Sequence, residues 1–304
     1  MRLFAAVALL VLLAACAGPG APGACGFAAR SALPIIRLGP FAAVASSADG
    51  TPVTLVIDTG NTALTLLSAT AAQRARLVPD IQRPVHTAGI GGAGTYPTGR
   101  IGRLLLGTIP VKPAVVAIMP TVPLADGFIG MDILGDADLD IDMPAGRITL
   151  YSGRLCPGAM PPWDVPATEL PTAARVSQLL PASARPHQLL LAMELDGVPA
   201  LAELDTGAGH TVVTRAFAAR LGITDAALAG GPALRLPGLS AEAGEGHKWH
   251  FREARIGAEL FPSPVMLVAD LPDPGFDVLL GMDYFLTHRV WLSYGARRIF
   301  VAPR

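Results

Sequence analysis

The sequence has 304 residues, a formal net charge of −1, and charged side chains at only 15% of its positions. This balance excludes a basic nucleic-acid-binding protein and a chain with an acidic tail. The length suits two domains of ordinary size, and 33 glycines with 28 prolines favour many short strands joined by turns over long amphipathic helices.

The N-terminal residues are typical of an export signal. Arg2 is followed by an uncharged apolar run at 3–13, which is too short to span a bilayer. The run ends in Leu13-Ala14-Ala15-Cys16, which resembles the bacterial lipobox. This resemblance implies a signal peptide at 1–15, acylation of Cys16 and a membrane-anchored periplasmic lipoprotein. The alternative is an ordinary secretory peptide that is cleaved nearby, with Cys16 incidental.

A tether rich in alanine, glycine and proline is expected at 16–32, before the first folded lobe. Export implies an oxidising compartment, and the two remaining cysteines, Cys25 and Cys156, flank that lobe. We therefore expect either a disulfide that closes the lobe or two unrelated thiols. These cysteines lack a convincing set of companion ligands, so the sequence does not predict a structural metal site.

The first lobe is predicted to span 33–155 and to consist of short strands. Its expected elements are strands at 34–38, 41–45, 52–57, 103–106 and 113–118, a short helix at 69–77, a Gly-rich hairpin at 89–102 and a closing hairpin at 138–151. Asp132 is expected to be the N-cap of a last short helix in this lobe.

A proline-rich linker at 156–186 leads to a second lobe at 187–304. The second lobe is predicted to repeat the order of the first. Its expected elements are strands at 188–195 and 199–204, a helix near 214–221, a hairpin region at 234–257 and strands that run to 268.

Two matching triplets mark a duplication. Asp58-Thr59-Gly60 and Asp205-Thr206-Gly207 each end an apolar strand. Each is followed by a second matching signal, and residues 130–151 align without gaps on residues 281–302. A period this long indicates a duplicated domain rather than an array of small repeats.

A duplicated module that supplies two aspartates can bring two carboxyls together. When the two carboxyls are close, their negative charges would repel each other if both ionised, so the pair shares one proton. The ionised carboxyl can then take a proton from a water molecule that attacks a carbonyl carbon, while the protonated carboxyl donates to the carbonyl oxygen. Asp58 and Asp205 are therefore the candidate catalytic residues of an aspartic peptidase, a chemistry that needs no metal and no cofactor.

These motifs, with Phe128-Ile129-Gly130 and its second copy Leu279-Leu280-Gly281, resemble the retropepsin group of aspartic peptidases. The likeness is greatest to bacterial retropepsin-like proteins that carry both lobes in one chain, and it covers 33–304. It implies an all-β fold of two tandem closed β-barrel lobes with short helices, related by a pseudo-twofold axis in a pepsin-like bilobal arrangement. One chain would then suffice for an active site that cleaves peptides or unfolded proteins.

The resemblance also assigns roles to the neighbours of the two aspartates. Thr59 and Thr206 are expected to hydrogen-bond across the lobe interface and to lock the two loops together. Gly60 and Gly207 allow the tight turn after each aspartate, where a Cβ would be penalised.

The Gly-rich hairpin of the first lobe suits a flap that closes over substrate, with Gly91, Gly92 and Tyr96 as candidate contacts. The same segment satisfies the pattern G-x-G-x-x-G at Gly89, Gly91 and Gly94. No helical pattern follows it and no acidic residue lies at the required distance, so a dinucleotide site is not predicted.

The second lobe departs from the first at Glu203, two residues before Asp205, where the first lobe has Val56. An acidic side chain there either points to solvent or disturbs the aspartate pair. The alternative function is therefore a catalytically inactive peptide- or envelope-binding lipoprotein that keeps the fold. His247 and His250 are interpreted as polar surface residues rather than as metal ligands.

Overall fold

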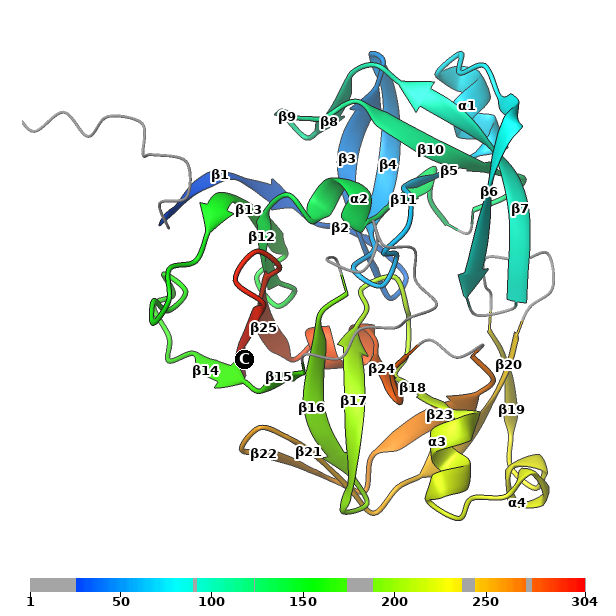
Figure 1. The fold of residues 1–304 in the computed structure, drawn as a ribbon, viewed down its shortest axis with the longest axis vertical. Helices are drawn as coiled ribbons and strands as arrows, with labels where there is room; N and C mark the ends of the chain where they lie inside the picture. The colour runs from blue at the N-terminus through cyan, green and yellow to red at the C-terminus, as the bar shows by residue number, and fades with distance from the viewer. Residues whose placement is uncertain are drawn as a thin grey trace, which may run out of the picture.

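The computed structural model describes residues 26–89, 92–122, 124–173, 188–236, 244–271 and 275–303. Two lobes rich in β-strands lie one above the other in Figure 1, and a third sheet stands beside them. The predicted all-β, bilobal fold with short helices is confirmed.

The first lobe is a ten-stranded sheet. Its hydrogen-bonded order is β6 (Asp80–Gly89), β7 (Gly92–Ile101), β10 (Ala114–Met119), β5 (Leu66–Ser68), β11 (Gly127–Ile129), β4 (Thr51–Ile57), β3 (Phe41–Ala48), β8 (Leu104–Leu106) and β9 (Ile109–Val111), with β2 (Ile36–Leu38) paired to β3.

The second lobe repeats this order strand for strand in another ten-stranded sheet. The order is β19 (Ala233–Leu236), β20 (Gly244–His250), β23 (Val265–Ala269), β18 (Val212–Thr214), β24 (Val278–Leu280), β17 (Val198–Leu204), β16 (Leu190–Leu195), β21 (Glu253–Ile256) and β22 (Glu259–Pro262), with β15 (Thr172–Ala173) paired to β16. The strands β4 and β17, which lead to the two aspartates, even share one burial pattern: their last three residues are buried on both faces.

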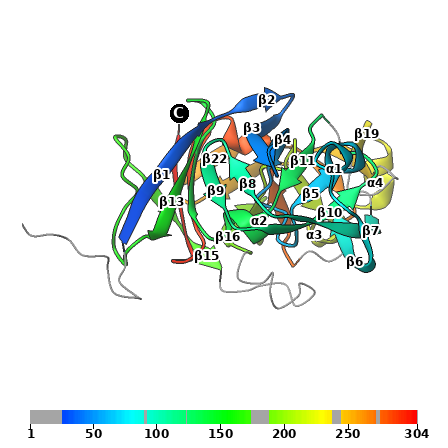
Figure 2. The ribbon, with the colours of Figure 1, turned by 90° about the horizontal axis from the view of Figure 1, so that it is seen from above.

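The third sheet draws strands from both copies. Its order is β1 (Gly26–Pro34), β13 (Arg147–Arg154), β12 (Asp138–Asp142), β25 (His288–Ser293), β26 (Arg298–Pro303) and β14 (Thr168–Leu170). At its centre β12 pairs with β25, and Arg289 donates to both carboxylate oxygens of Asp140 at 2.8 and 2.7 Å. Figure 2 shows β1 and β13 to one side of the lobes. The two copies are therefore joined by a continuous sheet and not by a linker alone.

The helices are short and lie at equivalent places. They are α1 (Ala69–Arg74) and α3 (Arg215–Arg220), α2 (Met131–Leu134) and α5 (Met282–Phe285), and α4 (Asp225–Ala229), which has no counterpart in the first lobe. Ser68 and Thr214 cap α1 and α3 by accepting the N–H groups of Ala71 and Phe217. Within the described parts of the chain, no helix has the length and apolar character needed to cross a membrane.

Two expectations about the connecting segments need correction. Residues 26–32, expected in a tether, belong to β1, because their backbone groups pair antiparallel with β13. The linker expected at 156–186 contributes β14 and β15 to two sheets. Cys156 is disulfide-bonded, whereas Cys16 and Cys25 lie outside the described residues.

Candidate active site

Asp58 and Asp205 each follow a strand that runs into the contact between the lobes. The Asp58 N–H donates to the Ile129 carbonyl at 3.1 Å, and the Asp205 N–H donates to the Leu280 carbonyl at 2.9 Å. In both lobes the neighbouring strand, β11 or β24, runs parallel to the strand that carries the aspartate. The two aspartate loops are thus held in the same way by the two copies of the module.

Each aspartate carboxyl lies against the glycine of the opposite loop. A Cβ atom on Gly60 would overlap the carboxyl group of Asp205, and one on Gly207 would overlap that of Asp58. Only glycine permits this approach at either position, for reasons of space. Asp58 and Asp205 are 8% and 9% exposed, so both residues are largely removed from water but not fully enclosed.

The cross-lobe hydrogen bonds expected of the two threonines are present. The Thr59 hydroxyl donates to the Leu204 carbonyl at 2.7 Å, and the Thr206 hydroxyl donates to the Ile57 carbonyl at 2.7 Å. Each hydroxyl also accepts the backbone N–H of the other threonine, at 3.2 and 3.1 Å. All of these groups are buried, so the arrangement fixes one loop against the other with almost no freedom.

A second pair of aspartates holds each loop from behind, and sequence reasoning missed this role. Asp132 accepts the N–H and the hydroxyl of Thr65, both at 2.9 Å, and the same hydroxyl accepts the Gly130 N–H. Asp283 and Thr211 repeat this arrangement in the second lobe. The N-cap of α2 is therefore Gly130, and the N-cap expectation for Asp132 was wrong, because its carboxylate binds a residue far away in sequence. Burial raises the pKa of Asp132 to about 6.

The two central carboxyls are hydrogen-bonded to each other and differ in their surroundings. Burial, and then the charge of Asp205, raise the pKa of Asp58 well above its ordinary value of 3.8. Burial also raises the pKa of Asp205, but the Gly207 N–H at 2.7 Å, the Asp58 carboxyl and two further backbone N–H groups oppose that rise. Because three backbone N–H groups act on Asp205 and two act on Asp58, these donors favour the negative charge on Asp205 and the shared proton on Asp58.

The residues that follow the two triplets contribute backbone donors only. The Asn61 N–H donates to Asp58 at 3.0 Å, whereas its side-chain amide donates to the Leu64 carbonyl at 2.7 Å. Ala208 has no polar side chain, but its backbone N–H helps to lower the pKa of Asp205. Neither side chain therefore donates a hydrogen bond to the aspartate pair.

Glu203 points inward rather than to solvent. It is 5% exposed, its side chain is hydrogen-bonded to Gln188, and its Oε1 atom has no hydrogen-bond partner among the described residues. Burial and then the charge of Asp205 raise the pKa of Glu203 well above its ordinary value of 4.5. The lobe therefore places a third carboxyl beside the pair, at a position where sequence analysis left its direction open.

The expected flap is the β6–β7 hairpin of the first lobe. Gly92 begins β7, Tyr96 lies within it, and Gly91 is outside the described residues. Tyr96 packs on the apolar cluster of Leu66, Ala117 and Met119. The corresponding hairpin of the second lobe, β19–β20, lies on the same side of the molecule in Figure 1. Gly89 and Gly94 belong to this hairpin and not to a strand–helix turn, so they do not form a dinucleotide site.

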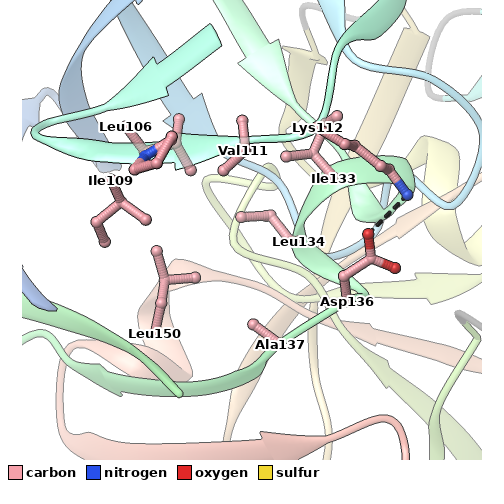
Figure 3. Close-up of a pocket in the computed structure, with 10 residues that line it drawn as sticks. Leu106, Ile109, Val111, Lys112, Ile133, Leu134, Asp136, Ala137 and Leu150 are labelled. Carbon is pink, nitrogen blue, oxygen red and sulfur yellow. Dashed lines mark ion pairs between the residues drawn. The ribbon is translucent and has the colours of Figure 1, made fainter. Parts of the chain in front are cut away.

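Neither the histidines nor a cavity of the first lobe competes with the aspartates as a reactive site. His247 pairs with Glu245 at 3.2 Å, and across the described ranges no group of three or more His, Cys, Asp or Glu side chains could hold a metal ion. A cavity of about 240 Å³ lies in the first lobe, where α2 and the β8–β9 hairpin form part of its wall (Figure 3). An exposed ion pair between Lys112 and Asp136, at 2.8 Å, lies at its edge.

The comparisons with known proteins agree with this geometry. The sequence pattern of the aspartyl protease family matches residues 44–133 and 191–284, which together make up more than half of the chain. No curated protein matches the sequence. The crystal structure of an aspartic proteinase from Irpex lacteus is similar in fold, with a TM-score of 0.51 and 14% sequence identity, over 91% of this chain and 97% of that one. On the family match, and with the fold in agreement, this chain belongs to the aspartyl protease family.

Proposed function

We propose that the protein is an aspartic endopeptidase in which Asp58 and Asp205 activate water. The observation that carries this proposal is the contact of the two carboxyls, each lying over the glycine of the opposite loop and hydrogen-bonded to the other. A pair of buried carboxyls in such contact is costly for folding, because both are desolvated and they repel each other when ionised. Catalysis by a shared proton explains why each lobe supplies a carboxyl despite this cost.

The proposed reaction uses the two carboxyls in different roles. Asp205, as the carboxylate, takes a proton from a water molecule while the water oxygen bonds to the peptide carbonyl carbon. Asp58 gives its proton to the carbonyl oxygen, which produces a tetrahedral diol. When the carbon–nitrogen bond breaks, Asp205 gives the proton that it took from water to the leaving nitrogen, and one diol hydroxyl returns a proton to Asp58 as the carboxylic acid product forms. The pair regains its single proton, so no group is consumed.

A peptide substrate is supported by what flanks the pair. Each lobe carries a separate apolar cluster: Leu66, Ala117 and Met119 in the first lobe, and in the second a cluster that includes Val212, Leu279 and Ala208, the residue directly after the second triplet. The Thr and Gly residues of the two triplets add no charge beside the two aspartates. We therefore propose that peptides or unfolded proteins with apolar side chains next to the cleaved bond are the substrates.

Turnover of an unfolded protein tests this proposal. The purified protein is incubated with a reduced, denatured substrate protein, with and without an inhibitor that mimics the tetrahedral transition state. We expect cleavage at defined bonds and its suppression by the inhibitor. Cleavage that continues with the inhibitor bound in excess, or no cleavage between pH 3 and 7 by a folded sample, would contradict an aspartic peptidase activity.

We further propose that the protein is a periplasmic lipoprotein anchored through Cys16. The support is the apolar run at 3–13 and the lipobox-like Leu13-Ala14-Ala15-Cys16. Cys16→Ala should release the protein from the membrane fraction, because the acyl chains would have no other site of attachment. Retention of this variant on membranes after a high-salt wash would contradict lipid anchoring and indicate an uncleaved signal segment.

A further inference from the structure

Glu203 is a buried carboxyl that the proposed reaction does not use. It lies in β17, and Asp205, two residues later, continues the pairing of that strand by donating its N–H to the Leu280 carbonyl, so strand alternation places both side chains on the same side. Its Oε1 atom is buried and has no hydrogen-bond partner in the described ranges. Burying a carboxyl oxygen without a hydrogen-bond partner next to Asp205 costs much more free energy when the carboxyl is ionised than when it is neutral.

The corresponding positions in the first lobe are apolar. Val56 takes the place of Glu203, and Met143 takes the place of Tyr294 in the gap-free repeat of residues 130–151 and 281–302. All four side chains are buried. The second lobe thus has two titratable side chains where the first lobe has two apolar ones, while the Asp-Thr-Gly triplet is the same in both.

The surroundings decide which carboxyl carries charge. The groups that act on Glu203 are the charges of Asp205 and Asp58 and the side chain of Gln188. The phenol of Tyr294 faces the same cluster, and its pKa is raised by burial and then by the charge of Glu203. Asp205 accepts the Gly207 N–H and further backbone donors, whereas Gln188 is the one hydrogen-bond partner of Glu203 among the described residues. A single negative charge is therefore held on Asp205.

We propose that Glu203 is a positioning residue of the aspartate pair, one that serves as a neutral acid and whose loss of a proton ends activity at the upper pH limit. This inference rests on the proposed peptidase function. While Glu203 is neutral, the three carboxyls carry one negative charge, and it resides on the general base Asp205. A second negative charge on Glu203 would favour protonation of Asp205, and the pair would lose its base.

The pH profile of Glu203→Gln tests the proposal, because glutamine keeps the shape and remains neutral. In the wild-type protein, loss of a proton from either Glu203 or Asp58 ends activity, whereas in the variant only Asp58 can lose one. We expect the alkaline limb of kcat/KM to move to higher pH by roughly half a unit or more. The acidic limb and the kcat at the optimum should change little. An alkaline limb that stays in place or moves to lower pH, or a folded but inactive variant, would overturn the proposal.

Thermal unfolding provides a readout that does not depend on activity. The native pKa of Glu203 lies above its ordinary value of 4.5, so the native state keeps a proton that the unfolded chain loses as pH rises. Stability is therefore lost as pH rises from about 4.5 towards the native pKa, and Glu203→Gln removes this loss. The Tm difference between the variant and wild type should grow across that window.

Two further variants complete the design. Glu203→Val installs the residue of the first lobe and should show the same growing Tm difference. Glu194→Gln removes an exposed carboxylate of the adjacent strand β16 and should show none. A Tm difference that is flat with pH in both Glu203 variants would overturn the neutral-acid role even if no peptide substrate were found. A growing difference without cleavage would instead count against the peptidase function alone.

Discussion

The two lobes match most closely in the Asp-Thr-Gly triplets that face each other, and they differ at several positions away from that contact. Each loop supplies an aspartate, a threonine that bonds across the interface and a glycine that lies under the opposite carboxyl. Behind the aspartates the match is only partial: Asp132 and Asp283 hold the two loops alike, but Val56 in the first lobe corresponds to Glu203 in the second. Positions that contact the other copy are constrained by both lobes, whereas positions that contact only their own lobe can diverge.

The places where the lobes meet the third sheet show the same divergence. In the second lobe Tyr284 and His288 stack with ring centroids 4.2 Å apart, and His288 is hydrogen-bonded to Glu259 at 2.9 Å. In the first lobe Ile133 and Ala137 stand at these positions and line the cavity of Figure 3. Smaller side chains at equivalent places leave a void that two rings fill in the other copy.

The largest effect is expected when the catalytic aspartate of either lobe is substituted. Asp58→Asn and Asp205→Asn should each lower kcat/KM by roughly a thousandfold or more, because one carboxyl and one amide cannot exchange the shared proton. Initial rates on a peptide substrate measure this loss. Asp136→Asn, which removes an exposed carboxylate of the first lobe, is the matched control and should keep the wild-type rate. A variant of either central aspartate that retains most of the rate would exclude the paired mechanism.

A smaller effect is expected from breaking the contact between the lobes. Thr206→Val leaves the Thr59 N–H and the Ile57 carbonyl buried without partners, so the free energy of unfolding should fall by roughly 2 kcal/mol or more. Thr59→Val should cost a similar amount, since its contacts are the mirror image, and the double variant should cost less than the sum. Urea denaturation measures these values. Thr206→Ser keeps the hydroxyl and should lose little; an equal loss in Thr206→Ser would mean that the methyl group, and not the hydrogen bonds, stabilises the contact.

Sequence reasoning was sufficient for features that a short motif encodes. The two Asp-Thr-Gly triplets and their apolar strands predicted the duplicated loops, because only certain residue types fit there. The partner of Asp132 was not predictable in this way, since Thr65 is distant in sequence and becomes adjacent only when β5 and β11 pair. A matched Thr65 and Thr211 ahead of each second signal was the clue that could have revealed it.

The shared sheet was missed for a similar reason. Pairing of β12 with β25 joins strands from different copies, and no local pattern records such a contact. The composition of residues 26–32 suggested a tether, but an edge strand needs little more than free backbone groups beside β13. For Glu203, strand alternation predicts the side that it shares with Asp205, but not whether that side is buried.

The smallest effect is expected at the position after the second triplet, where the two lobes have different residues. Ala208→Ser offers a hydroxyl donor to Asp205, and a carboxylate that gains a hydrogen bond has a lower pKa. Because the acidic limb of kcat/KM marks protonation of the base, this limb should move to lower pH by less than about one unit. The unmodified protein should work best in weak acid. An optimum in strong acid, or an acidic limb that does not move in Ala208→Ser, would show that this position does not tune the pair.

The most direct test of the central claim is the titration of the Asp58 carboxyl itself, followed by carbon NMR in the wild-type protein and in Asp205→Asn. Burial and the charge of Asp205 both hold its pKa above 3.8, and the substitution removes the charge and leaves the burial. We therefore expect Asp58 to stay protonated well above its ordinary range in the wild type and to titrate at clearly lower pH in the variant. An Asp58 that titrates at the same pH in both proteins would show that the two carboxyls do not act as a pair.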